Sequence, residues 1–195
     1  MWASRSREHV SSVTTDRATL PRTLASLLRV RLFGRKREAE PPPPAEVYTD
    51  LRQQVLGLTP DQLEGITVDD AEVFALLMET GYPEAVATLV VVADGTSSLY
   101  FSNGGGFIGA GTHAAVADAS RRLLLKGHEY LPRLSSVTDP PPPAEGRTQF
   151  VVVTRDGLRG AVAPEAELGE GEHSLSPLFY AGHDVIMQIR LVEGG

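Results

Sequence analysis

Val73-Phe-Ala-Leu-Leu-Met-Glu79 is an almost continuous apolar run, and Gly81-Tyr82-Pro83 ends it. A short apolar run bounded by turn residues predicts a strand that is buried on both faces. The valine-rich run Ala87–Ala93 predicts a second strand, and Ser97–Ser102 predicts a third. Asp94-Gly95 between them is a strong hairpin signal, so we expect the second and third strands to pair antiparallel.

Helical patterns lie on either side of these strands. Val47–Leu56 predicts a short helix before them, and the segment from His113 to about Lys126 predicts one after them. The inward stripe expected of this second helix is Val116, Ala119, Leu123, Gly127 and Tyr130. Ser176, as a cap with proline at the next position, predicts the start of a last helix. Its expected buried stripe is Leu178, Gly182, Val185, Ile186 and Ile189.

Two further strands are predicted before the last helix. They cover Gln149–Thr154 and Leu158–Ala163, and Asp156-Gly157 predicts the turn between them. The order is therefore helix, three strands, helix, two strands, helix. This order predicts an α+β fold, with one five-stranded, mostly antiparallel sheet and helices packed against it.

Charge divides the 195-residue chain into two parts. Residues 1–40 hold nine basic and four acidic residues, a net charge of +5, whereas residues 41–195 hold nine basic and 21 acidic residues, a net charge of −12. We expect a basic, partly disordered tail over residues 1–44 and one α+β domain over residues 45–195. The acidic domain argues against nucleic acid as a partner, because phosphate binding needs Lys and Arg.

Within the tail, residues 20–33 predict a short basic amphipathic helix, because leucines recur at helical spacing and arginines flank them. Two interpretations stay open. The helix packs on its own domain, or it contacts a membrane surface or a partner. The residues that would make a membrane contact are Leu20, Leu24, Leu27, Leu28, Arg29 and Arg31.

Two proline tracts, Pro41–Pro44 and Pro140–Pro143, both read acid-Pro-Pro-Pro-Pro-Ala-Glu. Runs of proline lack amide donors and favour the polyproline II conformation. Nothing around the two tracts matches, so we interpret the first as a linker and the second as part of a long loop.

Composition excludes several classes of site. The chain has no cysteine, which rules out disulfides, iron–sulfur clusters and a cysteine nucleophile. It also lacks the apolar run of about 20 residues that a transmembrane helix needs, and the apolar segment of a signal peptide. We therefore expect a soluble, cytoplasmic protein.

The glycine-rich segment Gly104-Gly-Gly106-Phe-Ile-Gly109 matches the dinucleotide pattern G-x-G-x-x-G. Its context argues against a nucleotide, because the preceding strand belongs to a hairpin and a proline loop follows the next helix. Two interpretations remain: glycines that supply positive φ for a tight turn, with Gly106 the best candidate, or free amides that bind an anion or small molecule. The candidate binding residues are Asn103, Gly104, Gly105, Gly106, Thr112 and His113.

No set of side chains predicts catalysis or a metal site. The five histidines form neither an H-x-x-x-H nor an H-E-x-x-H pair. Ser174, His183 and Asp184 could be drawn as a triad, but no G-x-S-x-G elbow supports it. Glu165, Glu167, Glu170 and Glu172 are expected to form a solvated acidic loop. We therefore expect no catalytic residue, no metal and no cofactor.

Three stretches resemble a group of uncharacterised bacterial proteins: Met78–Pro83, Asp94–Gly106 and His173–Tyr180. That resemblance covers most of Val73–Glu193 and carries no assigned activity. The order of elements also resembles the type III secretion chaperones and their YbjN-like relatives. This second resemblance implies dimerisation and the binding of partner segments rather than catalysis, and it assigns no binding residue.

These features together predict a non-enzymatic protein-interaction or chaperone-like module, whose partner is another protein or a second copy in a homodimer. One alternative is a small-molecule or anion-binding protein, enzymatic or not, that uses the Gly104–His113 loop. The other alternative is a peripheral membrane protein that binds through the helix over residues 20–33.

Overall fold

A computed structural model describes residues 44–63 and 72–193 of the chain. The helix expected over residues 20–33, with the contacts expected of it, lies outside the described residues. The helices are α2 (Pro44–Leu56), α3 (Ala114–Tyr130), α4 (Glu165–Glu170) and α5 (Ser176–Glu193). Short 3-10 turns lie at Pro60–Leu63, Ala110–Thr112 and Leu131–Arg133.

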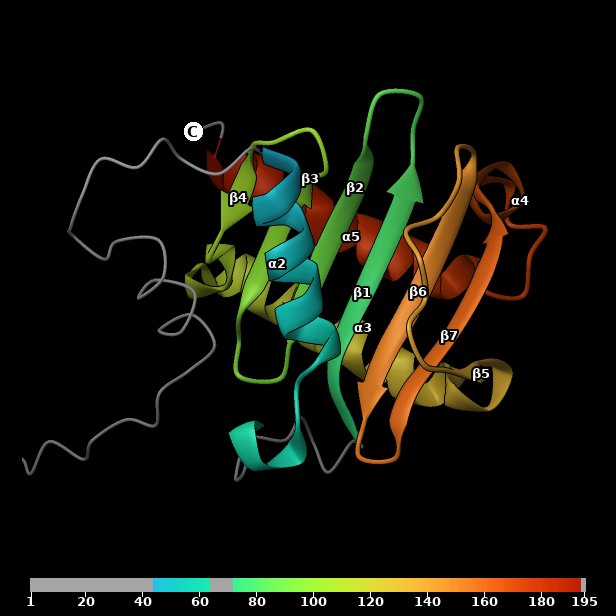
Figure 1. Ribbon diagram of the computed structural model, residues 1–195, viewed down its shortest axis with the longest axis horizontal. Helices are drawn as coiled ribbons and strands as arrows, with labels where there is room; N and C mark the ends of the chain where they lie inside the picture. The colour runs from blue at the N-terminus through green and yellow to red at the C-terminus, as the bar shows by residue number, and fades with distance from the viewer. Residues whose placement is uncertain (1–43, 64–71, 194–195) are drawn as a thin grey trace, which may run out of the picture.

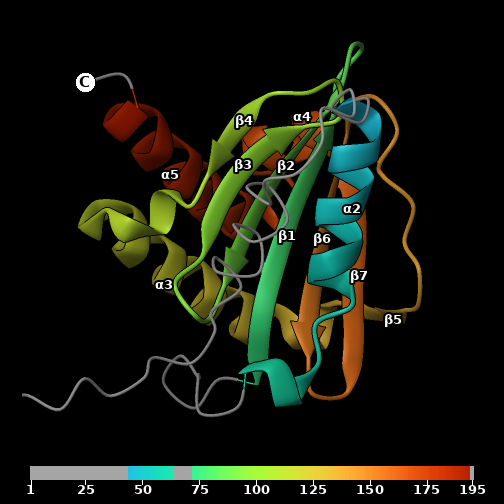
Figure 2. The same cartoon turned by 60° about the vertical axis from the view of Figure 1, so that its left-hand side comes forward.

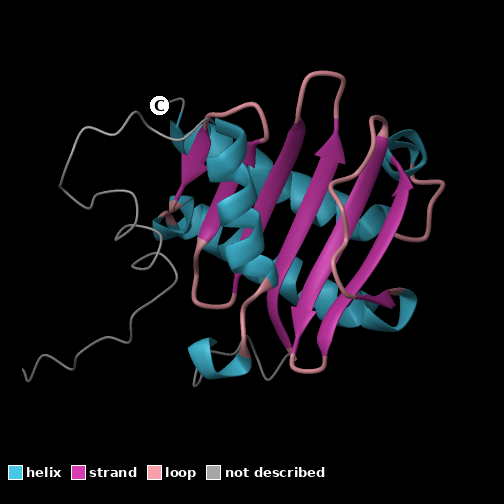
Figure 3. Ribbon diagram, viewed as in Figure 1, coloured by secondary structure: helices cyan, strands magenta, loops and turns pink. Residues whose placement is uncertain are grey.

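Within these residues, seven antiparallel strands form one sheet in the order β4-β3-β2-β1-β6-β7-β5 (Figures 1 and 3). The strands are β1 (Val73–Gly81), β2 (Val86–Val92), β3 (Ser97–Phe101), β4 (Gly106–Ile108), β5 (Ser135–Val137), β6 (Arg147–Thr154) and β7 (Gly157–Pro164). The predicted α+β class and both predicted hairpins, β2–β3 and β6–β7, are confirmed.

Strand β1 lies at the centre of the sheet, as its apolar run predicts. Leu77 pairs with Val90 of β2 on one side and with Val151 of β6 on the other. All nine residues of β1 are buried, which is possible because both faces of the sheet are covered around it.

The predicted number of five strands is wrong, because the sequence predicts neither β4 nor β5. Strand β4 lies in the glycine-rich segment and pairs with β3 through Leu99 and Phe107. Strand β5 pairs with β7 through Ser136 and Arg159. Each is three residues long and lies at an edge of the sheet, so pairing with a distant neighbour defines it rather than local propensity. The segment expected to be an acidic loop also forms α4 in part.

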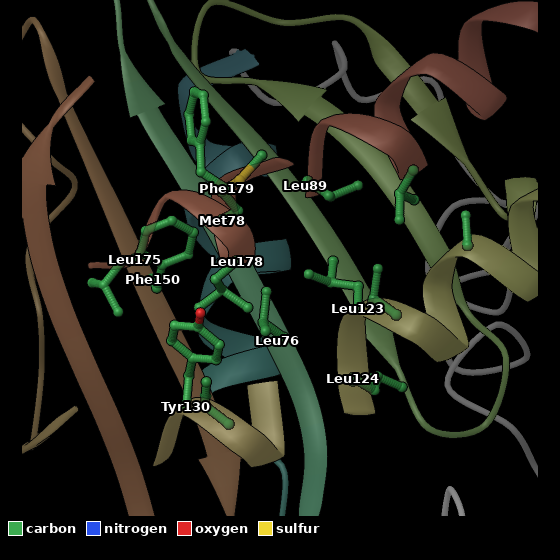
Figure 4. Packing of buried hydrophobic residues seen from close by; sticks show 14 of the residues in the cluster. Leu76, Met78, Leu89, Leu123, Leu124, Tyr130, Phe150, Leu175, Leu178 and Phe179 are labelled. Atoms are coloured by element: carbon green, nitrogen blue, oxygen red, sulfur yellow. The ribbon is translucent and has the colours of Figure 1, made fainter. Parts of the chain in front are cut away.

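Helices cover both faces of the sheet. Figures 1 and 2 show α2 on one face and α3 with α5 on the other. Side chains alternate between the two faces, so Leu77 packs beneath α2 whereas Leu76 and Met78 pack against α3 and α5. Figure 4 shows Leu123 of α3 and Leu178 of α5 beside Leu76 in the second of these cores.

Residues 138–146, which we call the proline strap, link β5 to β6 and cross the α2 side of the sheet (Figure 1). The end of the strap is fixed to β1, where Glu145 forms a parallel bridge with Gly81 and Gly146 N donates to Gly81 O over 2.9 Å. A Cβ atom at Gly81 would overlap the carbonyl of Ala144. The close approach of the strap therefore requires glycine at position 81.

Candidate functional site

The six residues predicted to bind a ligand lie at the two ends of β4. Residues 103–105 form the turn between β3 and β4, and Gly106 is the first residue of β4. Thr112 ends the 3-10 turn that follows β4, and His113 caps α3. A three-residue strand spans about 10 Å, so the expected single loop is two separate turns. Ligand binding at these residues stays a prediction.

The glycines of this segment serve the hairpin itself. Gly106 has a φ of 141°, which confirms the positive φ predicted for it. A Cβ atom there would lie 2.5 Å from Leu99 O and 2.6 Å from Tyr100 Cα. Gly109 also has a positive φ of 80°, but nothing lies within 4 Å of the space a Cβ would fill. Backbone geometry thus explains these glycines without a ligand.

Glu79, at the end of the apolar run Val73–Glu79, is the centre of a buried polar network between α2 and the sheet. The side chains of Glu79 and Arg52 are 0% and 4% exposed. Arg52 donates from Nε to Glu79 Oε1 over 2.8 Å and from Nη2 to Oε2 over 2.9 Å. Three more donors reach the carboxylate: Tyr48 Oη at 3.3 Å, Thr88 Oγ1 at 3.2 Å and Gln149 Nε2 at 3.1 Å.

The same network holds the proline strap. Arg52 Nη2 donates to Pro140 O over 2.6 Å, and Gln149 Nε2 donates to Pro141 O over 3.1 Å. Pro140 and Pro143 are buried, and the two prolines between them are exposed. Polyproline II has three residues per turn, and this spacing of buried prolines matches one edge of such a helix facing the sheet and α2.

Burial and charge shift the pKa values of two members of the network, Tyr48 and Arg52. Burial, together with the negative charge of Glu79, raises the pKa of Tyr48 to about 12. Burial alone would lower the pKa of Arg52, but the hydrogen bonds and charge of Glu79 outweigh it and raise that pKa. Since Glu79 is out of reach of solvent, the role that the contacts support is to fasten α2 and the proline strap to the sheet.

A second feature is the face of α5 that points away from the sheet. Tyr180, Met187 and Leu191 are 47%, 53% and 64% exposed. Their spacing places them on one side of the helix, opposite the buried Leu178 and Val185. An open groove of about 530 Å³ runs along this side, and it is also lined by His183, Asp184, Ile186 and Arg190.

Polar side chains border this groove. Toward α3, Arg122 Nη2 donates to Asp184 Oδ2 over 2.7 Å. Burial lowers the pKa of His183, an effect that the charge of Glu165 opposes and that of Arg190 increases. A largely apolar surface with charges of both signs at its border has the composition of a protein-binding surface.

The triad that could be drawn from the sequence does not form. Asp184 pairs with Arg122, and His183 Nε2 is buried without a hydrogen-bond partner. Among the described residues, no group of three His, Asp or Glu side chains could hold a metal ion. None of the helices in the described ranges is long and apolar enough to cross a membrane.

No protein-family model, no curated protein and no solved structure matches this chain. The candidate sites therefore rest on geometry. Sequence reasoning missed the network of Arg52 and Gln149, although one signal was present: Glu79 is a charged residue in a run predicted to be buried on both faces. It also missed the outward face of α5, whose signal is that Met187 and Leu191 are apolar but lie off the predicted inward stripe.

Proposed function

We propose that this protein is a non-enzymatic interaction module that binds a partner protein through the outward face of α5. The observation that carries the proposal is the alignment of Tyr180, Met187 and Leu191 on that face, each 47–64% exposed. Contiguous exposed apolar side chains mark surfaces that bind other molecules. The flexible thioether of Met187 can adapt to the shape of a partner.

An amphipathic helix or an extended apolar segment is the partner that this surface fits. The groove follows the axis of α5, and Asp184 and Arg190 provide one charge of each sign at its border. A segment laid along the groove would cover its apolar centre and keep its own polar side in water.

Two further features support the proposal. The burial of Glu79 beneath α2 and the proline strap supports a role other than catalysis. The order of elements, with strands between three long helices, supports the chaperone-like part of the proposal. The type III secretion chaperones and YbjN-like proteins hold partner segments, and their plan of helix, three strands, helix, two strands, helix differs from this chain by the additional β4, β5 and α4.

Site-specific photo-cross-linking in the native host tests the proposal. A benzoylphenylalanine at position 187 of the full chain should give a discrete, light-dependent adduct, and one at exposed Arg155 in the β6–β7 turn should not. Leu191→Glu, one turn along α5 from the probe, should remove the adduct by placing a charge in the apolar centre.

A matched control is Val162→Glu. Val162 is 46% exposed, comparable to Tyr180. Its neighbours Ala161 and Ala163 pack toward α3 and α5, so its own side chain faces the opposite side of the sheet. The control should leave the adduct at position 187 intact. An adduct that survives Leu191→Glu, in a variant with an unchanged melting temperature, would rule out binding through α5.

A further inference from the structure

One seven-residue motif occurs twice in this chain, at Glu40–Glu46 and at Asp139–Glu145. Six of the seven residues are identical, and the remaining position is acidic in both. The second occurrence forms most of the proline strap, whereas the first leads directly into α2, which begins at Pro44. The structure therefore shows which residues the second occurrence of the motif contacts.

That surface, which we call the proline cradle, consists of Arg52, Gln149 and Gly81. The first two donate to the successive carbonyls of Pro140 and Pro141 over 2.6 and 3.1 Å. Gly81 gives the end of the strap room to approach the sheet. Polyproline II forms no internal hydrogen bonds, so its carbonyls are free to accept such donors. The cradle thus supplies two donors to the main chain of a proline segment and room for the residues that follow it.

We propose that the proline cradle is a binding site for this motif, and that its ligand in trans is the Glu40–Pro44 segment of a second copy of this chain. In this exchange the segment takes the place of the proline strap. Pro41 and Pro42 would present the carbonyls that Pro140 and Pro141 present in the strap.

Helix α2 of the second copy need not unwind for this exchange. Pro41 and Pro42 precede its first residue, Pro44, which corresponds to the buried Pro143. Proline keeps a φ near −65° at the first position of a helix, close to the −75° of polyproline II. The exchange therefore needs no change of φ where the segment joins the helix.

A second copy is required because the same chain cannot fill its own cradle with this segment. Figure 1 shows the N-terminal end of α2 near β3 and β4, whereas the proline strap crosses β6. Pro44 cannot occupy both places while α2 stays on the sheet. The strap, being tethered, competes with the incoming segment at an effective concentration in the millimolar range.

The test uses the full chain with Pro140–Pro143 replaced by Gly-Ser-Gly-Ser, studied by sedimentation equilibrium. This strap variant should self-associate about tenfold or more tightly than the intact chain, because the tethered competitor is gone. Adding Pro41→Gly with Pro42→Gly should abolish the association. Adding Pro83→Gly instead, an exposed proline in the β1–β2 turn, should leave it unchanged.

If the strap variant does not melt cooperatively, a second measurement tests the proposal. A labelled peptide of residues 36–44 is titrated into the intact chain and into Pro143→Gly, which loosens the strap without removing it. Binding should tighten several-fold in Pro143→Gly and should be lost when Gln149→Leu is added.

Three results would overturn the proposal. The first is a folded strap variant that stays monomeric and does not bind the peptide. The second is self-association that persists after the substitutions at Pro41 and Pro42. The third is peptide binding without self-association, which would exclude a second copy as the source of the ligand.

Discussion

Arg52 Nε lies 2.8 Å from Glu79 Oε1, and this ion pair joins α2 to the central strand where water does not reach. The same guanidinium donates to Pro140 O of the proline strap. One side chain thus connects three parts of the chain that are far apart in sequence. Its removal should affect the whole α2 side of the sheet.

Arg52→Leu should lower the free energy of unfolding by about 3–5 kcal/mol, because it leaves the Glu79 carboxylate buried without its partner. Urea denaturation monitored by circular dichroism measures the loss. The double variant Arg52→Leu with Glu79→Leu should recover much of it, since no buried charge then remains. If Arg52→Leu were as stable as the parent, the Arg52–Glu79 ion pair would make no net contribution to stability.

Alkaline pH should destabilise the protein through Tyr48. Its pKa is raised to about 12 in the folded chain, against about 10 for an unperturbed tyrosine. The unfolded chain therefore releases this proton first, so the stability that Tyr48 contributes is present below pH 10 and is lost as pH rises toward 12. Melting temperatures across this range should fall less steeply in Tyr48→Phe than in the parent. Equal slopes would contradict the raised pKa.

Gly106 and Gly109 form a matched pair for separating backbone strain from steric overlap. Both have positive φ, but only a Cβ at Gly106 would meet the β3 backbone. Gly109→Ala should cost about 1 kcal/mol of strain. Gly106→Ala should cost more, roughly 1–3 kcal/mol, because the hairpin must also move apart. If thermal unfolding showed equal losses of stability for Gly106→Ala and Gly109→Ala, β4 would be able to move away from β3 at no cost, which would contradict the steric argument.

Removal of the tail tests the predicted domain boundary. A chain that begins at Pro44 keeps α2 and should melt in one cooperative transition. A chain that begins at Gly57 lacks Tyr48, Leu51 and Val55, which cover the sheet on the α2 side. It should be insoluble or should bind hydrophobic dyes without a cooperative melt. A molten chain from Pro44 onward would place the tail within the core.

Elements with a local burial pattern could be predicted from the sequence. The inward stripe of α3 is an example, since every position predicted for it is buried: Val116, Ala119, Leu123, Gly127 and Tyr130. The Asp94-Gly95 and Asp156-Gly157 turns could be predicted equally well, because tight hairpin turns favour Asp-Gly. Strand β5 has no such signal. Its serines become a strand only because β7 lies beside them.

The contacts of the candidate sites depend on how distant elements meet. Glu79 could be assigned to a buried strand, but its partner lies 27 residues earlier, on a helix. Only the placement of α2 across the sheet brings the two together. In the same way, four of the five positions predicted for the inward stripe of α5 are buried, but Ile186 is half-buried and lines the groove. The exposure of Met187 and Leu191 depends on which elements cover the outward side of the helix.

The most direct test of partner binding through α5 is the size of the complexes that the full chain forms in extracts of its native host. Sedimentation velocity should show the parent in a species heavier than the 20.9 kDa chain. Leu191→Glu should shift the protein to the position of the free chain, and Val162→Glu should leave it in the heavier species. A Leu191→Glu chain that stays in the heavier species would contradict the proposed role of the α5 face.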